Sequence, residues 1–201
     1  MLYGIPCVGK STLAVAFAAR QSIRTVIQTD YVRELQRQLG PPDQAAALAN
    51  VTHDAWQRHG PPTQRNIEAG FLDHVEAVAV GIHAVARKVV SDGFDAVIEG
   101  AHFHGGLIAQ LRRAHTDAEI HPTLLVVGTA EELRRRVRAK EASRGQGAAD
   151  KQWQERVPIM LALQDFLVAD ARRHDIPVMT ADEWSSSWAP VRLPSTTSTT
   201  S

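Results

Sequence analysis

The sequence predicts an α/β domain in which helices flank a five-stranded parallel sheet. Short apolar runs alternate with helical patterns along the chain, a glycine-rich loop follows the first run, and a carboxylate follows the second and third runs. Both faces of a strand inside a parallel sheet are covered, so such strands are continuously apolar. The five expected strands are Leu2–Tyr3, Thr25–Ile27, Ala96–Ile98, Thr123–Val127 and Val178–Met179. We expect Leu2–Gly4 to pair in the centre of the sheet.

Helical patterns fill the stretches between these runs. The longest pattern spans Gln64–Ser91, where apolar side chains recur every three or four residues and so share one face. Gly93 follows it, and glycine commonly ends helices. The other expected helices are Ser11–Arg20, a helix after Asp30, Ala130–Ala142 and Lys151–Arg173. Pro158 lies inside the last of these, so a kink or a break is expected there.

The chain length fits one domain with a proper core. Its 201 residues are short for two domains, and we expect a single domain over residues 1–190. Proline and glycine bracket residues 41–62, which we expect to begin a helical insert that binds the acceptor. Residues 134–150 are expected to form an arginine-bearing lid. The polar, low-complexity residues 191–201 are expected to be disordered.

The bulk composition restricts the classes of partner. The formal net charge is zero and the pI is about 7.1, so bulk electrostatics favour neither a nucleic acid nor a membrane. The pattern shows no apolar run of the ~18 residues that would span a bilayer. A single cysteine, Cys7, allows no intramolecular disulfide and fits a reducing cytoplasm. These features are compatible with either a monomer or a homodimer.

The segment Gly4–Ser11 reads GIPCVGKS, which matches the phosphate-binding pattern G-x-x-x-x-G-K-[ST]. Its glycines allow successive backbone N–H groups to turn inward around a phosphate, at the N-terminus of a helix. Lys10 would reach the β and γ phosphates of ATP, and Ser11 would place its hydroxyl on Mg²⁺. The predicted nucleotide-binding residues of this loop are Gly4, Val8, Gly9, Lys10, Ser11 and Thr12.

Charged side chains follow the second strand in the segment QTDYVREL. Asp30 is placed at the carboxyl end of a parallel strand, where ligands bind in such sheets. It could take the proton of an attacking hydroxyl or help to hold Mg²⁺, and it could also cap the following helix. Arg33 and Arg37 are one turn apart on that helix. They would bind an anionic group of the acceptor, with Arg33 favoured, or else form surface ion pairs with Glu34.

The third strand ends in VIEGAHFHGG. Glu99 is expected to reach Mg²⁺ through its water shell, and His102 is expected to lie in the mouth of the site and contact the acceptor. His102 and His104 form an HxH pair, but two histidines without a third ligand argue poorly for zinc. Zinc is therefore the disfavoured interpretation.

Arginines are concentrated in the expected lid, at Arg134, Arg135, Arg136, Arg138 and Arg144. Arginines there can close over a transferring phosphoryl group and offset its charge. Most of the run must be solvated helix face. Arg138 and Arg144 are predicted to enter the site and bind the nucleotide, with Arg138 in a catalytic role, because they are nearest the glycine-containing stretch after the helix.

Together these features predict a P-loop NTPase of the nucleoside-monophosphate-kinase type. No guanine-reading NKxD segment follows the fourth strand, which argues against a GTPase, and the chain is short for a motor or transport ATPase. The chain resembles the 2-phosphoglycerate kinase family of P-loop kinases in GIPCVGKST, in VIQTDYVRELQR and in the IEGAH segment, over most of residues 4–180. It departs from that family after the histidine, where it has HFHGG.

The resemblance implies an ATP- and Mg²⁺-dependent kinase that phosphorylates a hydroxyl of a small molecule. By position it points to Lys10, Ser11, Asp30, Arg33, Glu99 and His102. The acceptor could be a secondary metabolite or an antibiotic in place of 2-phosphoglycerate. Two alternatives stay open: a zeta-toxin-like kinase of nucleotide sugars, and a regulatory protein that binds ATP without transferring phosphate.

Overall fold

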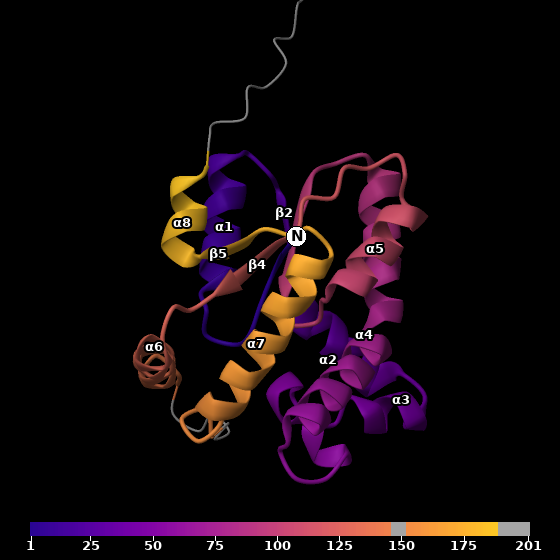
Figure 1. Cartoon of the computed structure of the whole chain (residues 1–201). Coiled ribbons are helices and arrows are strands. Elements are labelled where there is room, and N and C mark those ends of the chain that lie inside the picture. Colours follow the sequence, from indigo (N-terminus) through magenta and orange to yellow (C-terminus); the bar gives the residue numbers. More distant parts are fainter. Residues whose placement is uncertain (146–151, 189–201) are drawn as a thin grey trace, which may run out of the picture.

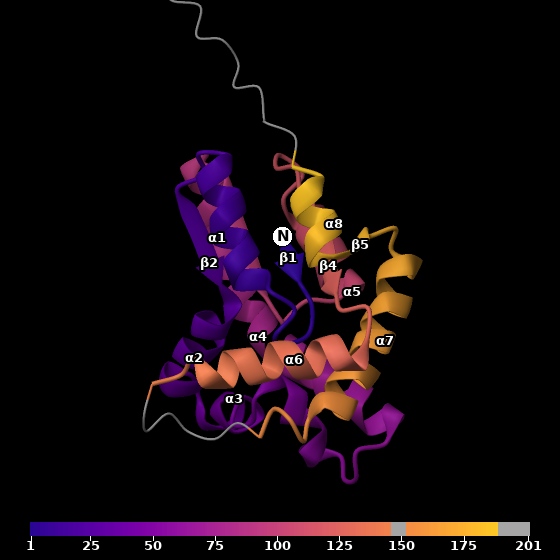
Figure 2. The same cartoon turned by 90° about the vertical axis from the view of Figure 1, so that its left-hand side faces the viewer.

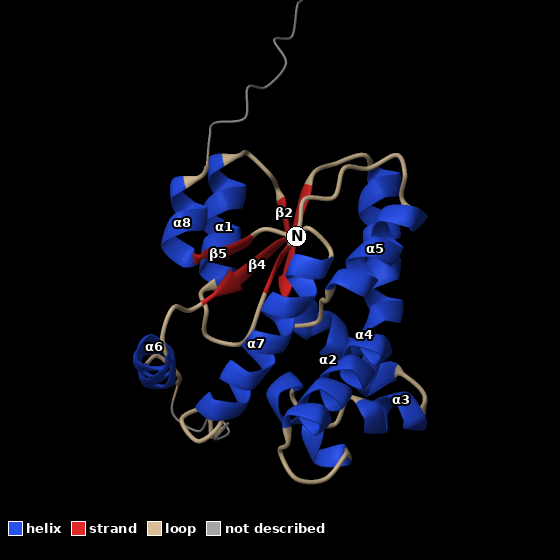
Figure 3. Cartoon of the chain, in the orientation of Figure 1, coloured by secondary structure: helices blue, strands red, loops and turns tan. Residues whose placement is uncertain are grey.

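A five-stranded, fully parallel sheet forms the centre of the computed structural model, which describes residues 1–145 and 152–188. The strands are β1 (Leu2–Tyr3), β2 (Thr25–Gln28), β3 (Ala96–Gly100), β4 (Thr123–Val126) and β5 (Val178–Thr180), in the order β2-β3-β1-β4-β5 (Figures 1 and 3). Leu2 pairs with both Glu99 and Thr123. The predicted parallel sheet and the central place of the first strand are therefore confirmed.

Helices cover both faces of this sheet and extend below its carboxyl edge. The helices are α1 (Lys10–Arg20), α2 (Thr29–Leu39), α3 (Pro42–Ala47), the 3₁₀ helix η1 (Thr52–Arg58), α4 (Gln64–Asp92), α5 (Gly105–Ala114), α6 (Ala130–Ala142), α7 (Val157–Arg173) and α8 (Ala181–Ser186). Helices α1 and α8 lie on one face, and α5 and α7 on the other (Figures 1 and 3). Figure 2 shows α6 running across the side of the molecule that faces the viewer, below the sheet in that view.

The long helix α4 follows the predicted bounds closely. The Thr63 side chain caps its first turn, and Gly93 ends it in the left-handed conformation with φ 68°. Contrary to the sequence-based expectation, an 18-residue window of this helix is apolar enough to span a bilayer, with mean hydropathy 1.3. Its buried residues, among them Phe71, Val78 and Ile82, belong to the core, so packing inside the protein accounts for that hydropathy.

Two predicted helix starts are wrong. Helix α7 begins at Val157, so Pro158 occupies the first turn and neither kinks nor breaks the helix. A proline is tolerated there because the first-turn N–H groups have no intrahelical partner. Helix α2 begins at Thr29 after the flanking residue Gln28, so Asp30 lies in the first turn and does not cap the helix.

Some predicted segments lie partly or wholly outside the described residues. The expected lid over residues 134–150 is described as far as residue 145, and the expected tail over residues 191–201 is not described. The start of the insert, residues 41–62, contains α3 and η1. Helix η1 packs on α4 and also contacts α7, so the insert is anchored on long helices of the core.

Candidate active site

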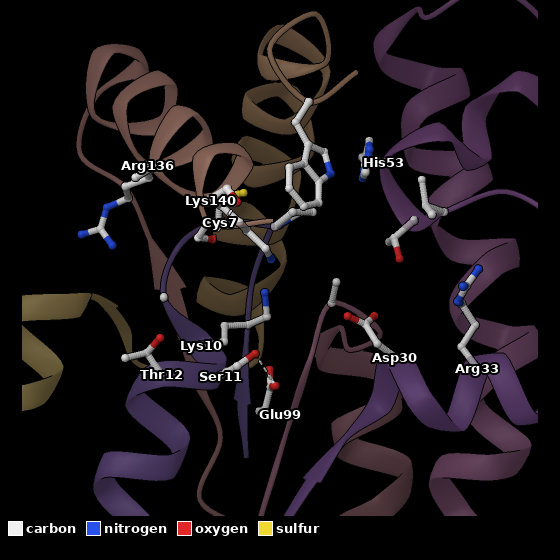
Figure 4. A pocket seen from close by; sticks show the side chains of 18 residues that line it. Cys7, Lys10, Ser11, Thr12, Asp30, Arg33, His53, Glu99, Arg136 and Lys140 are labelled. Carbon is white, nitrogen blue, oxygen red and sulfur yellow. Dashed lines mark hydrogen bonds between the residues drawn. The ribbon is translucent and has the colours of Figure 1, made fainter. Parts of the chain in front are cut away.

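A cavity of about 590 Å³ opens where the chain leaves the carboxyl ends of β1, β2 and β3 (Figure 4). The segments that line it are the glycine-rich loop, the first turn of α2, the start of η1, the end of β3 and one side of α6. Its lining residues are Pro6, Cys7, Gly9, Lys10, Ser11, Thr12, Asp30, Arg33, Val51, Thr52, His53, Glu99, Ala101, Arg136, Ala139, Lys140, Ser143 and Trp153. The cavity thus brings together segments that are far apart in sequence.

The loop backbone takes a shape that its glycines permit. Gly4 has φ 147°, and a Cβ atom there would lie 2.3 Å from the backbone oxygen of Leu125. Gly9 has φ 101° immediately before α1. L-residues with a side chain rarely adopt such values. Cys7 nevertheless has φ 67°, so the turn is sharp enough to hold even a non-glycine residue in the left-handed region.

Lys10 extends from the first residue of α1 into the cavity (Figure 4). Its side chain is buried, and Nζ donates a hydrogen bond to the backbone oxygen of Ile5 at 2.9 Å. Burial lowers the pKa of Lys10, while the negative charges of Glu99 and Asp30 act in the opposite direction. Lys10 is therefore a buried amine beside two carboxylates, in the place predicted for a phosphate contact.

Ser11 and Glu99 meet in the same part of the cavity (Figure 4). The Ser11 hydroxyl donates to Glu99 Oε1 at 2.6 Å. Glu99 is buried at the end of β3, and burial raises the pKa of its carboxyl, an effect that the Ser11 hydrogen bond and Lys10 oppose. A hydroxyl oxygen paired with a buried carboxylate suits the oxygen ligation that Mg²⁺ requires, so these two side chains fit the predicted cation.

Asp30 and Arg33 face the loop from the opposite wall (Figure 4). The Asp30 side chain is 77% exposed, so its carboxylate is open to a ligand. The Arg33 guanidinium is held in place, because Nη1 donates to the backbone oxygens of Leu48 at 3.1 Å and Asn50 at 3.2 Å. Arg33 therefore lines the cavity and also ties the insert to α2.

Arg37 is not among the described residues that line this cavity. Its guanidinium forms an ion pair with Glu34, and its Nε donates to Glu34 Oε2 at 3.0 Å. The surface ion-pair interpretation accounts for this residue. The predicted contact of Arg37 with the acceptor has no support in the geometry.

His102 lies behind the cavity wall, which differs from its predicted place in the mouth of the site. Its ring is fully buried, with Nδ1 2.7 Å from the Thr29 hydroxyl and Nε2 3.1 Å from the Thr52 hydroxyl. The backbone turns inward after β3 and carries the ring under the first turn of α2. His104 instead accepts a hydrogen bond from the backbone N–H of Gly106 at the start of α5. Within residues 1–145 and 152–188, no group of three His, Cys, Asp or Glu side chains could hold a metal.

Helix α6 contributes cations to the cavity, but from a different side than predicted. Arg136 and Lys140 line it, and Arg136 Nη1 donates to the loop oxygen of Val8 at 3.3 Å. Arg138 is exposed and, like Arg144, is absent from the lining among the residues described. The Arg144 guanidinium lies 5.2 Å from the centre of the Trp153 ring. Arg134 and Arg135 are exposed.

Sequence reasoning missed several lining residues, among them Thr52, His53 and Trp153. Thr52 and His53 begin η1, and both are buried. Trp153 precedes α7 and is also buried, although it forms part of the cavity wall. Nothing in the local sequence pattern marks these residues, since the packing of the insert and of the α7 start brings them to the site.

Two buried histidines should make the protein sensitive to mild acid. Burial lowers the pKa of His102 to about 4 and that of His74 to about 3, from a usual 6.5. The rings stack with centroids 5.4 Å apart. Between pH 6.5 and 4 the unfolded chain binds more protons than the folded one, so the free energy of unfolding falls as pH falls. Each histidine contributes at most about 1.4 kcal/mol per pH unit.

Urea unfolding at pH 7 and pH 5 measures this effect. We expect His74→Gln to lose less of its free energy of unfolding between the two pH values than the unmodified protein. His121→Gln is the control, because the His121 side chain is 83% exposed, and it should lose as much as the unmodified protein. An equal loss in His74→Gln and the unmodified protein would contradict the assignment.

The sheet order, the glycine-rich loop at the start of α1 and the buried lysine define a P-loop nucleotide-binding protein. A family model described as an AAA domain matches residues 1–157. The chain belongs to this family, and its fold is that of an α/β P-loop kinase.

The chain is also similar to several archaeal kinases. It is 33% identical to the 2-phosphoglycerate kinase of Pyrococcus furiosus, over 89% of this chain and 57% of that protein. It is 29% identical to the 2-phosphoglycerate kinase of Methanopyrus kandleri, over 89% of this chain and 54% of that protein. A Thermoplasma acidophilum mevalonate-3-phosphate 5-kinase is 33% identical over 50% of this chain and 48% of its own length. The resemblance seen in the motifs is confirmed, and the chain spans a little over half the length of these two 2-phosphoglycerate kinases.

Proposed function

We propose that this protein is an ATP- and Mg²⁺-dependent kinase that transfers the γ-phosphoryl group to a hydroxyl of a small molecule. The observation that carries this function is that Lys10 and Ser11 line one side of a cavity and Asp30 and Arg33 line the other side of the same cavity. Phosphoryl transfer requires both substrates to meet in one site, in line with each other. A protein that only binds ATP has no need of the second wall.

The donor side would hold the triphosphate of ATP on the backbone N–H groups of Gly4–Thr12 and on Lys10. Ser11 and Glu99 would hold Mg²⁺, Ser11 directly and Glu99 through a water molecule. When bound, the ion neutralises the negative charge that develops on the phosphates. Arg136 and Lys140 would complete this side from α6, in the role first predicted for Arg138 and Arg144.

The acceptor side would present one hydroxyl group to Asp30. In the transfer step, the acceptor O–H bond breaks and its proton passes to the Asp30 carboxylate. The acceptor oxygen forms a bond to the γ phosphorus, the bond from phosphorus to the bridging oxygen breaks, and ADP leaves. Arg33 and the residues that begin η1 would surround the rest of the acceptor.

The size of the cavity favours a small acceptor. Its volume of about 590 Å³ must take the phosphate end of ATP as well as the acceptor, which leaves limited room for a nucleotide sugar. The named relatives support the same class, since the names of two of them specify kinases of 2-phosphoglycerate and of mevalonate 3-phosphate. The acceptor is therefore a small molecule of that kind, or a secondary metabolite or antibiotic of similar size.

Mass spectrometry of incubated metabolites tests this function. The purified protein is mixed with ATP, Mg²⁺ and either 2-phosphoglycerate or a fractionated cell extract. We expect at least one compound to gain the mass of one phosphoryl group, and only when ATP is present. ATP binding without any such product, across extracts from several sources, would favour the regulatory ATP-binding protein and contradict the kinase.

A further inference from the structure

His102 connects the two segments that build the acceptor wall. Its Nδ1 lies 2.7 Å from the hydroxyl of Thr29, at the start of α2, and its Nε2 lies 3.1 Å from the hydroxyl of Thr52, at the start of η1. The same Nε2 is 3.9 Å from Asp30 Oδ1. A neutral histidine has one donor and one acceptor nitrogen. Two arrangements are therefore possible: Nδ1 accepts and Nε2 donates, or Nδ1 donates and Nε2 accepts.

The buried Thr29 hydroxyl decides the direction on one side. Thr29 is completely buried, and the His102 ring is the partner that the described structure gives its hydroxyl. A Cβ atom at Gly100 would lie 1.7 Å from the Thr29 hydroxyl oxygen. The backbone at the end of β3 therefore packs directly against this hydroxyl. A buried hydroxyl proton without an acceptor costs free energy. Thr29 must therefore donate to Nδ1, which makes Nδ1 the acceptor nitrogen.

The proton of the ring is then on Nε2, and two observations agree with this tautomer. The Asp30 carboxylate lies on the Nε2 side and favours a proton there. Thr52, unlike Thr29, lines the cavity and is not completely enclosed. Thr52 can accept from Nε2–H and still place its own proton outward. In the opposite tautomer, with the proton on Nδ1, the Thr52 hydroxyl would donate its hydrogen bond to the ring. The Thr29 hydroxyl proton would then have no acceptor.

We propose that Thr52 is an acceptor-binding residue whose hydroxyl donates a hydrogen bond into the cavity, and that His102 is the positioning residue that fixes this direction. This role rests on the proposed kinase function and deepens it. Thr52 Oγ1 and Asp30 Oδ1 flank the same nitrogen, at 3.1 Å and 3.9 Å. The acceptor therefore carries a second oxygen atom, a hydroxyl, carboxylate or phosphate oxygen, close to the hydroxyl that it presents to Asp30.

Long-range ¹H–¹⁵N correlation spectra of the histidine rings test the hydrogen-bond direction without any substrate. The His102 signals are assigned by their loss in His102→Gln. At pH 7 we expect a neutral ring with the proton on Nε2 and a bare Nδ1. A ring with the proton on Nδ1, or a charged ring, would overturn the proposal whatever the protein phosphorylates.

Steady-state kinetics test the contact with the acceptor, using 2-phosphoglycerate or the compound phosphorylated in the extract assay. Thr52→Val should raise the KM for the acceptor about 10-fold, the loss expected for one hydrogen bond, with kcat and the KM for ATP changed less than about 3-fold. Thr52→Ser keeps the hydroxyl and should retain the KM of the unmodified protein. An unchanged acceptor KM in Thr52→Val would overturn the assignment of Thr52 alone. Failure of the unmodified protein to phosphorylate any compound would overturn the kinase function together with it.

Two conservative variants of His102 separate positioning from general support of the fold. A glutamine amide reaches toward the Nε2 position and an asparagine amide toward the Nδ1 position. We expect His102→Gln to retain the acceptor KM and His102→Asn to raise it as much as Thr52→Val. The double variant Thr52→Val/His102→Asn should be no worse than either single variant, within about 2-fold, since both remove one interaction. Additive losses, or equal effects of the two His102 variants, would contradict the positioning role.

Discussion

Lys10→Ala is expected to lower kcat by about 100- to 1,000-fold, because the Lys10 ammonium is the loop cation aimed at the phosphates. The protein should stay folded. Lys10 is buried beside Glu99 and Asp30, and its Nζ donates a hydrogen bond to Ile5 of its own loop, so losing this bond unties no distant segment. Initial-rate kinetics with ATP, together with a thermal unfolding curve, measure both effects.

Lys88→Ala is the matched control for this variant. The Lys88 side chain is 72% exposed and pairs with Asp92 on the surface of α4. Surface pairs of this kind contribute little to stability, so Lys88→Ala should keep the kcat and the melting temperature of the unmodified protein. Full turnover in a folded Lys10→Ala protein would refute the assignment of the glycine-rich loop as the donor site.

Asp30→Asn is expected to lower kcat by about 100- to 10,000-fold, the range that general-base catalysis supplies. The amide keeps the size of the side chain but cannot take the proton of the acceptor hydroxyl. The Asp30 side chain is largely exposed in the cavity, so the change should leave the fold intact. The KM for ATP should change less than about 3-fold, since Asp30 faces the acceptor.

Asp43→Asn provides the control from the same region of the chain. Asp43 lies in the exposed first turn of α3, outside the cavity lining among the described residues. The control should keep both kinetic constants. A kcat in Asp30→Asn equal to that of the unmodified protein would show that another group takes the proton.

The fold and the donor side follow from local sequence features. Parallel strands buried on both faces must be apolar, and the runs Leu2–Tyr3, Val26–Ile27 and Ala96–Ile98 are. Parallel strands also share one carboxyl edge. Any polar residue directly after them is therefore brought to the same place, which is why Asp30 and Glu99 could be predicted beside Lys10.

The side of α6 that faces the cavity could have been predicted from the spacing of the apolar residues in this helix. Leu133 and Val137 are buried, so Arg136 and Lys140 lie next to the buried face. At about 100° per residue, Arg136 and Lys140 lie about 80° and 40° from the midpoint between Leu133 and Val137, whereas Arg138 lies about 120° from it. Helical periodicity therefore predicts which arginines of α6 enter the cavity better than their distance from the glycine-containing stretch, on which the prediction of Arg138 was based.

Beyond Asp30 and Arg33, the acceptor side could not be read from the sequence, because contacts between distant segments build it. His102 was expected to face the acceptor, but the turn after β3 places it under Thr29 and against Thr52. Trp153 reaches the cavity only because the chain returns from α6 to α7. None of these contacts has a local periodicity or motif that would predict it.

In the proposed kinase, one cavity holds ATP on the Lys10 side and a small hydroxyl compound on the Asp30 side. The most direct test follows ADP and the phosphorylated compound together, with the purified protein, Mg²⁺ and one acceptor. The kinase predicts one ADP for each phosphorylated acceptor, and the loss of both products in Lys10→Ala and in Asp30→Asn. ADP formed with free phosphate and no phosphorylated acceptor, or an acceptor product that persists in both variants, would contradict it.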